Sequence, residues 1–297
     1  MIRTPLARRG ATALTVSACT VSACTVSACT VSAFTVSALT VTAWSTAAIG
    51  SASAAPRQQA TSGACQVPRQ GHYAVMAMGT LVAGSGSTPE ARLIEERWLA
   101  GGALEGRIVE RLGSELRSGT YRGSVQLVGP CLAQVRRQLP WGSQLSEAVL
   151  DSRGRPLYSL DRGSGTVITA RWLPMASGSC QAADLNGVVL SSQVGLNRRS
   201  GAQGWSPNAV IQREQWRDGR VQGLALSSHG GVGDTAAYSG RLQLEPNSCW
   251  GDLVERDARG VDYTYRALIV PGRNGARGYL YLQRDANDLS VGWLVRD

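Results

Sequence analysis

Two short motifs in this chain pair a carboxylate with an indole. They are Glu96-x-Trp98 and Glu214-x-Trp216. Residues two apart in a β-strand lie on the same face of the sheet, so each glutamate points where its tryptophan points. If that face is the interior of the fold, the buried carboxylate needs a hydrogen-bond partner or a ligand.

A tyrosine follows each motif at a matching distance, as Tyr121 and Tyr238. An inward glutamate beside these rings would bind the polar head of an amphipathic molecule while the aromatic rings hold its apolar body. The alternative is an outward face on which each glutamate pairs with a cross-strand arginine. We expect this outward arrangement, because charged side chains are rarely buried. The ligand-binding candidates of the inward alternative are Glu96, Trp98, Tyr121, Glu214, Trp216 and Tyr238.

The elements that carry these residues occur twice in the chain. Each copy has a strand ending in Glu-x-Trp, a turn, a strand with an early glycine, then Tyr-x-Gly, Gln-Leu and a cysteine. Later segments end at Trp172 in one copy and at Trp293 in the other. Each copy spans roughly 115 residues, enough to bury its own core. The sequence therefore predicts two tandem modules, at 65–174 and 180–297, joined by a linker at 175–179.

Within each copy we expect about eight short strands, because apolar alternation is interrupted at regular intervals by Gly, Pro, Asp or Ser turns. The predicted fold class is all-β, as two antiparallel β-barrels of calycin-like form or two sandwiches. In the first copy the strands are expected at 71–82, 92–99, 103–112, 119–128, 132–139, 146–150, 156–160 and 165–172.

The first 54 residues have the layout of an export leader. Three arginines precede a long small and apolar tract of TVSAC-type repeats, and Ala52-Ser53-Ala54 matches an A-x-A cleavage site. Residues 1–54 are therefore predicted to be a signal peptide and 55–64 a short linker. The tract also contains V-S-A-C three times, which resembles a lipoprotein lipobox and gives the alternative of a lipid anchor at Cys19, Cys24 or Cys29. An uncleaved membrane anchor is a third alternative.

Four cysteines remain after the leader: Cys65, Cys131, Cys180 and Cys249. An even number in an exported chain predicts disulfides, and four cysteines allow three pairings. Pairing Cys65 with Cys131 and Cys180 with Cys249 treats the two copies alike. The expected location is therefore periplasmic, extracellular or at the cell surface.

Several classes of function find no support in the composition. The net charge falls from +9 to +6 without the three leader arginines, and no basic stripe occurs, so we expect no nucleic-acid partner. The two histidines, His72 and His229, lie at unrelated places in the copies, so we expect no metal site and no cofactor. His229 is expected in a hairpin loop. Contact with a membrane is expected only through the leader.

The cysteine and tyrosine spacing resembles that of a group of exported bacterial proteins. Cys65 followed by Gly71-His72-Tyr73, then Gly119-Thr120-Tyr121 leading to Cys131, is similar to the pattern of small lipocalin-like or allene-oxide-cyclase-like β-barrels of undefined activity. Asp218-Gly219 in the second copy resembles a middle element of that pattern. The resemblance implies a barrel fold and carries no catalytic residue across.

Three functions follow as alternatives. The first is an exported, non-catalytic tandem barrel that binds a small amphipathic ligand or a cell-envelope partner. The second is a structural or surface-interaction protein with filled barrel cores. The third is an enzyme that uses Glu96 or His72 as an acid or base in one copy only. A duplicated chain without a duplicated catalytic set favours the first.

Cleavage after the A-x-A site predicts a mature chain that begins near Ala55. N-terminal sequencing of the protein recovered from its host would check this. A blocked terminus at Cys19, Cys24 or Cys29 would instead establish the lipid anchor.

Overall fold

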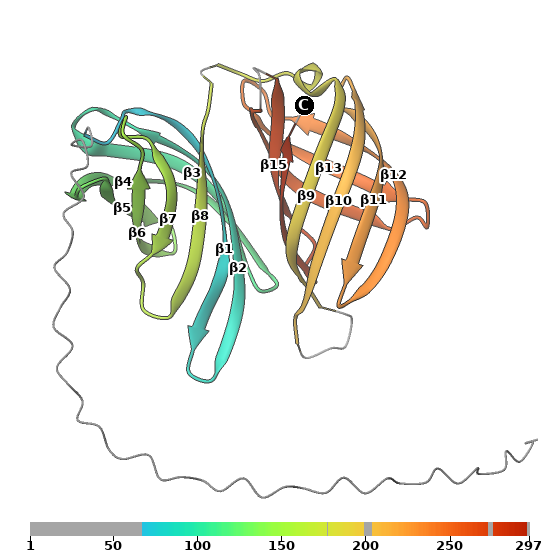
Figure 1. Ribbon diagram of the computed structural model, residues 1–297, viewed down its shortest axis with the longest axis horizontal. Coiled ribbons are helices and arrows are strands. Elements are labelled where there is room, and N and C mark those ends of the chain that lie inside the picture. Colours follow the sequence, from blue (N-terminus) through green and yellow to red (C-terminus); the bar gives the residue numbers. More distant parts are fainter. Residues whose placement is uncertain (1–66, 177, 199–203, 273–275, 296–297) are drawn as a thin grey trace, which may run out of the picture. The chain divides into compact units, whose positions relative to one another are not determined.

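The protein consists of two closed eight-stranded antiparallel β-barrels in tandem, as described by a computed structural model (Figure 1). The structure describes residues 67–176, 178–198, 204–272 and 276–295. The predicted leader and the residues near Cys65 lie outside these ranges. The all-β class and the tandem barrels are confirmed, and closure selects the barrel over the sandwich.

The first barrel is an up-and-down meander in which each strand pairs with the next and β8 returns to β1. Its strands are β1 (Gly71–Ala83), β2 (Gly86–Trp98), β3 (Ala103–Leu112), β4 (Glu115–Gly129), β5 (Leu132–Leu139), β6 (Gly142–Leu150), β7 (Pro156–Asp161) and β8 (Thr166–Pro174). All eight predicted strands are present, but β2 begins six residues before its predicted start, and β4 and β6 each begin four residues before theirs. The turn and alternation pattern identified them because every strand has one face toward the interior.

The second barrel repeats this order, with β16 returning to β9. Its strands are β9 (Gly187–Asn197), β10 (Ser206–Arg217), β11 (Arg220–His229), β12 (Val232–Leu244), β13 (Trp250–Asp257), β14 (Asp262–Pro271), β15 (Arg277–Gln283) and β16 (Asp288–Val295). A short 3₁₀ helix, η2 (Ala182–Leu185), precedes it, and η1 (Ala100–Gly102) connects β2 to β3.

The strand register defines which residues of the two copies are equivalent. Glu96 pairs with Gly106 and Glu214 pairs with Gly223, so these positions align the barrels. The same register places Trp172 opposite Val75, whereas Ser192 lies opposite Trp293. The two terminal tryptophans are therefore not equivalent. Trp172 is buried in the first core, while Trp293 faces outward.

Outward-facing side chains of β2 are also buried, because they contact the second barrel. Ala91 and Leu93 are fully buried and belong to the same apolar cluster as Leu280 and Leu282 of β15. Trp250 adds a polar contact, since its Nε1 donates to Glu95 Oε2 at 2.6 Å. The two cores are nevertheless separate, because each is enclosed by its own sheet.

Cys180 and Cys249 form a disulfide within the second copy, which bears out that half of the predicted pairing. Cys131 is also disulfide-bonded, and the Cys65 half of the other predicted pair lies outside the described residues. Such bonds persist in oxidising compartments, in keeping with export.

The Cys180–Cys249 bond closes a loop of 69 residues. Replacing both cysteines with alanine is expected to lower the free energy of unfolding by about 4 kcal/mol, because the unfolded chain regains loop entropy. Urea denaturation of oxidised wild type and of the double variant measures the difference. Equal unfolding midpoints would show that the bond does not stabilise the fold, and peptide mapping without reductant verifies the pairing.

Candidate functional site

Glu96 and Glu214 lie inside their barrels and are fully buried. The expected outward arrangement is therefore wrong, and the reason is that each carboxylate has internal donors. Trp98 Nε1 donates to Glu96 Oε1 at 2.7 Å, and Tyr121 OH donates to Oε2 at 2.5 Å. These charge-assisted hydrogen bonds replace the hydration that burial removes.

Glu214 has the same two donors and one more. Trp216 Nε1 donates to Oε2 at 2.6 Å, Tyr238 OH donates to Oε1 at 2.9 Å, and Tyr279 OH donates to Oε2 at 2.9 Å. The repeated Glu-x-Trp and tyrosine motifs therefore specify one structural unit in each barrel.

A glycine near the start of the third strand of each barrel makes room for the tyrosine. A Cβ at Gly106 would lie 2.4 Å from Tyr121 OH, and a Cβ at Gly223 would lie 2.4 Å from the Tyr238 ring. Such distances are far inside van der Waals contact, so any larger residue would push the ring away from the glutamate. This close approach accounts for the early glycine that the two copies share.

The interior of the first barrel is filled by arginine–carboxylate pairs. Arg137 Nε donates to Glu96 Oε2 at 2.5 Å and its Nη1 donates to Ser146 Oγ at 3.0 Å. Towards the other end, Arg92 pairs with Glu90, Glu110 and Asp161, and Arg117 pairs with Glu110. Burial is the largest single influence on the pKa of Arg137 and lowers it, but the attraction and hydrogen bond of Glu96, together with Tyr121 and Asp161, raise that pKa on balance.

The second barrel replaces this arginine with an acid. Gly123 pairs with Arg137 in the first barrel and Gly240 pairs with Glu255 in the second, so Glu255 occupies the position of Arg137. Burial, and then repulsion from Glu214, raise the pKa of Glu255 well above its ordinary value. Burial likewise raises the pKa of Glu214 to about 7, against the opposing effect of its hydrogen bonds from Trp216, Tyr238 and Tyr279.

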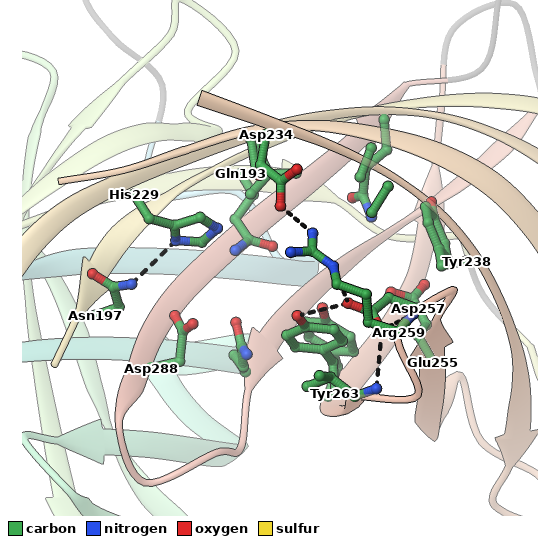
Figure 2. Close-up of a pocket in the computed structure, with 18 residues that line it drawn as sticks. Gln193, Asn197, His229, Asp234, Tyr238, Glu255, Asp257, Arg259, Tyr263 and Asp288 are labelled. Atoms are coloured by element: carbon green, nitrogen blue, oxygen red, sulfur yellow. Dashed lines mark hydrogen bonds and ion pairs between the residues drawn. The ribbon is translucent and has the colours of Figure 1, made fainter. Parts of the chain in front are cut away.

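A cavity of about 380 Å³ lies in the second barrel on the side of the His229 end of β11 (Figure 2). This volume is within the range of small-molecule sites. The lining combines amides, acids, tyrosine rings and small apolar side chains. The lining residues are Gln193, Asn197, Val210, Gln212, Ala225, Ser227, His229, Asp234, Ala236, Tyr238, Glu255, Asp257, Arg259, Val261, Tyr263, Tyr265, Gln283 and Asp288.

The cavity exists because small residues replace the buried network of the first barrel. Arg92 pairs with Glu110 across β2 and β3, and the equivalent pair across β10 and β11 is Val210 with Ser227. By the same register, Ala225 occupies the position of Ile108. Loss of the guanidinium and of the larger aliphatic side chain leaves the space open.

The rim of the cavity carries an exposed ion pair. Arg259 pairs with Asp234, and Figure 2 shows this contact between their side chains. His229 Nδ1 accepts a hydrogen bond from the Asn197 amide at 3.1 Å. Asp288 Oδ1 accepts from Ser290 Oγ at 2.6 Å and from Asn208 Nδ2 at 3.0 Å, while burial, the largest influence, raises its pKa.

Of the six predicted site residues, Tyr238 alone lines this cavity. Gln212 of β10 lines the cavity, whereas Glu214 and Trp216 are the next two inward-facing residues of that strand and do not. Glu96, Trp98 and Tyr121 belong to the filled first barrel. The structure thus brings the candidates together as two separate triads.

His72 lies on the outer face of the first barrel and pairs with Glu95 at 2.7 Å. His229 ends β11 next to a glycine turn, as expected for a hairpin, but its side chain also lines the cavity. Sequence reasoning missed Glu255, Gln283 and Asp288. Aligning QVRRQ at 134–138 with DLVER at 252–256 would have revealed the exchange of Arg137 for Glu255.

Among the described residues, no group of three or more His, Cys, Asp or Glu side chains is arranged to hold a metal ion. In the same part of the chain, no helix has both the length and the apolar character needed to cross a membrane.

No family model matches this chain, and no curated protein matches its sequence. Solved structures with some likeness include a protein of unknown function from the DUF3598 family of Nostoc punctiforme PCC 73102. It is 12% identical, the match covers 76% of this chain and 95% of that chain, and the TM-score is 0.19. A porin-like protein from Bacteroides uniformis ATCC 8492 is 8% identical over 78% of this chain and 99% of that chain, with a TM-score of 0.18. At such scores neither carries an argument about fold or function, and the lipocalin-like or allene-oxide-cyclase-like resemblance stays a prediction.

The two buried glutamates are expected to respond oppositely to amidation. The pKa of Glu214 is raised from 4.5 to about 7, so wild type becomes less stable as the pH rises through that range. Glu214→Gln has no carboxyl to titrate and does not lose this stability. Between pH 4.5 and 7.5 the free energy of unfolding of the variant should rise by about 3 kcal/mol relative to that of wild type. Glu96→Gln leaves Arg137 buried without its carboxylate and should cost about 3–5 kcal/mol.

Urea denaturation of both variants and wild type at pH 4.5, 6 and 7.5 measures these differences. A parallel loss of stability in both variants at every pH would contradict the different charge environments of the two barrels.

Proposed function

We propose that this protein is an exported, non-catalytic binding protein whose second barrel holds a small amphipathic molecule. The observation that carries the proposal is the cavity of about 380 Å³ in one barrel at positions that the other barrel fills with arginine and acid side chains. A cavity formed by small side chains in an otherwise well-packed fold costs stability, so a bound molecule is the simplest reason for it.

The lining suits a molecule with one polar end and one apolar part. Val210, Ala225 and Ala236 provide aliphatic surface, and the tyrosine rings at 238, 263 and 265 extend it. The amide and carboxyl groups between them supply hydrogen bonds that would orient the polar end.

The first barrel has a structural role in this proposal. Its interior is occupied by Arg92, Arg137 and their carboxylate partners, which fits the filled-core alternative for that module alone. Acid–base catalysis by His72 or Glu96 has less support, because neither residue lines the cavity. The Cys180–Cys249 bond supports export, and the periplasmic, extracellular or surface location remains part of the proposal.

A cavity-filling pair of substitutions tests this function. Ala225 and Ala236 face each other across β11 and β12, and both line the cavity. Ala225→Phe with Ala236→Phe should abolish binding. The matched control is Leu224→Phe with Ala237→Phe, the adjacent cross-strand pair on the outer face.

Native mass spectrometry of protein gently extracted from its own host is the readout, with thermal melting to verify folding. A small molecule should accompany wild type and the outer-face control and be absent from the filled variant. A wild-type protein without any bound molecule, or a filled variant that retains it, would refute the proposal.

A further inference from the structure

The cavity of the second barrel is lined by more acids than bases. Glu255, Asp257 and Asp288 lie within it and Asp234 lies at its rim, whereas Arg259 is the one basic side chain other than His229 among the described lining residues. The Arg259 side chain is 61% exposed and is already paired with Asp234 and Asp257. Glu255 and Asp288 therefore have no ion-pair partner among the described lining residues.

The first barrel shows how this fold otherwise balances interior acids. Its three interior arginines, Arg92, Arg117 and Arg137, each pair with at least one buried carboxylate. The equivalent positions of the second barrel, fixed by the register, are Val210, Asp234 and Glu255. All three internal cations have been lost, although the buried glutamate of the repeated motif is retained.

Glu214, Glu255 and Asp288 accordingly have no salt bridge to any described residue of the chain. Burying carboxyl groups without a countercharge is costly unless they are neutralised or a partner arrives from solution. The raised pKa values of Glu255 and Asp288, caused first by burial, agree with the missing countercharge.

A second, independent observation is an acceptor that lacks a donor. Gln283 lines the cavity and is 1% exposed, and its Oε1 atom is buried with no hydrogen-bond partner. Its Nε2 atom donates to Asp285 Oδ2 at 3.2 Å, which fixes the orientation of the amide. A buried acceptor of this kind normally receives a hydrogen bond, and the N–H or O–H group of a molecule in the cavity would supply it.

The tyrosines complete a site of recognisable chemistry. Tyr238, Tyr263 and Tyr265 contribute rings to the lining. Aromatic faces attract organic cations and also pack against apolar groups. An ammonium head has three N–H donors and no acceptor, which matches carboxyl groups and an amide oxygen.

We infer that the second barrel binds a small organic ammonium ion, with its charged head among the carboxyl groups of the cavity and an apolar body against the tyrosine rings. This inference rests on the proposed binding function and specifies its ligand class. An anionic ligand would be repelled by the same carboxylates, and a neutral alcohol would satisfy Gln283 but leave the acids unpaired.

Three probes of nearly equal shape separate these ligand classes. They are 2-phenylethylammonium, 2-phenylethanol and 3-phenylpropanoate, titrated into the purified full mature protein at pH 7.5 with binding followed by ligand-observed NMR. We expect the ammonium to bind at least about tenfold more tightly than either analogue, the advantage typical of one charge-assisted hydrogen-bonded contact.

Charge-removing variants locate the effect. Glu255→Gln and Asp288→Asn should each reduce the affinity for the ammonium about tenfold and leave the affinity for the alcohol within about twofold. Asp218→Asn is the matched control, because it also removes one carboxylate. Asp218 lies in the β10–β11 turn, and the cavity lies towards the other end of β11, at His229. Thermal melting verifies that each variant is folded.

The outcomes separate the two proposals. Equal binding of the three probes, or tighter binding of the carboxylate, would overturn the ammonium inference and leave the binding function intact. The same holds if a neutral or anionic molecule accompanies the native protein while the ammonium fails to bind. If no probe binds and no molecule accompanies the wild-type protein, the proposed function falls as well.

Discussion

The buried glutamate of each barrel is the group on which the rest of the interior depends. A carboxylate can occupy an all-β core only when donors surround it, and here one indole N–H and one phenol O–H converge on it from neighbouring positions of the sheet. This requirement fixes the tryptophan two residues away, the tyrosine across the sheet and the glycine that makes room for its ring. One polar group thus determines the spacing of the repeated motif.

The two barrels differ in how they balance the remaining charge. Arg137 completes the first core with a strong local pair, and the space around it is closed. Glu255 lies at the same position in the second core, so two acids are neighbours there where the first barrel has an ion pair. The framework of strands is unchanged by this exchange. The barrel with a cavity therefore differs from the filled barrel in a few inward side chains, and both have the same order of strands.

Much of the fold was predictable from the sequence, because turn residues and period-two alternation are local patterns that each strand carries itself. The direction of the Glu96 and Glu214 side chains was not predictable, because charged side chains are rarely buried and this favoured the outer face of the sheet. The donors Tyr121 and Tyr238 become neighbours of these carboxylates only when β4 and β12 are placed beside β3 and β11. Gln283 and Asp288 are likewise ordinary polar residues until closure brings β15 and β16 to the same interior. The equivalence of Trp172 and Trp293 that the sequence suggests is also wrong, because the two side chains face opposite sides of their sheets.

The first and last strands of each barrel are hydrogen-bonded neighbours, with Tyr73 opposite Pro174 and Leu190 opposite Val295. The chain consequently enters and leaves each module at the same rim. A gene segment that encodes such a barrel can be duplicated in tandem without changing the path of the first barrel. The second copy simply continues from the end of the last strand, which lies beside the start of the first. Because each copy closes on itself, the interior of one barrel can change while the interior of the other stays filled.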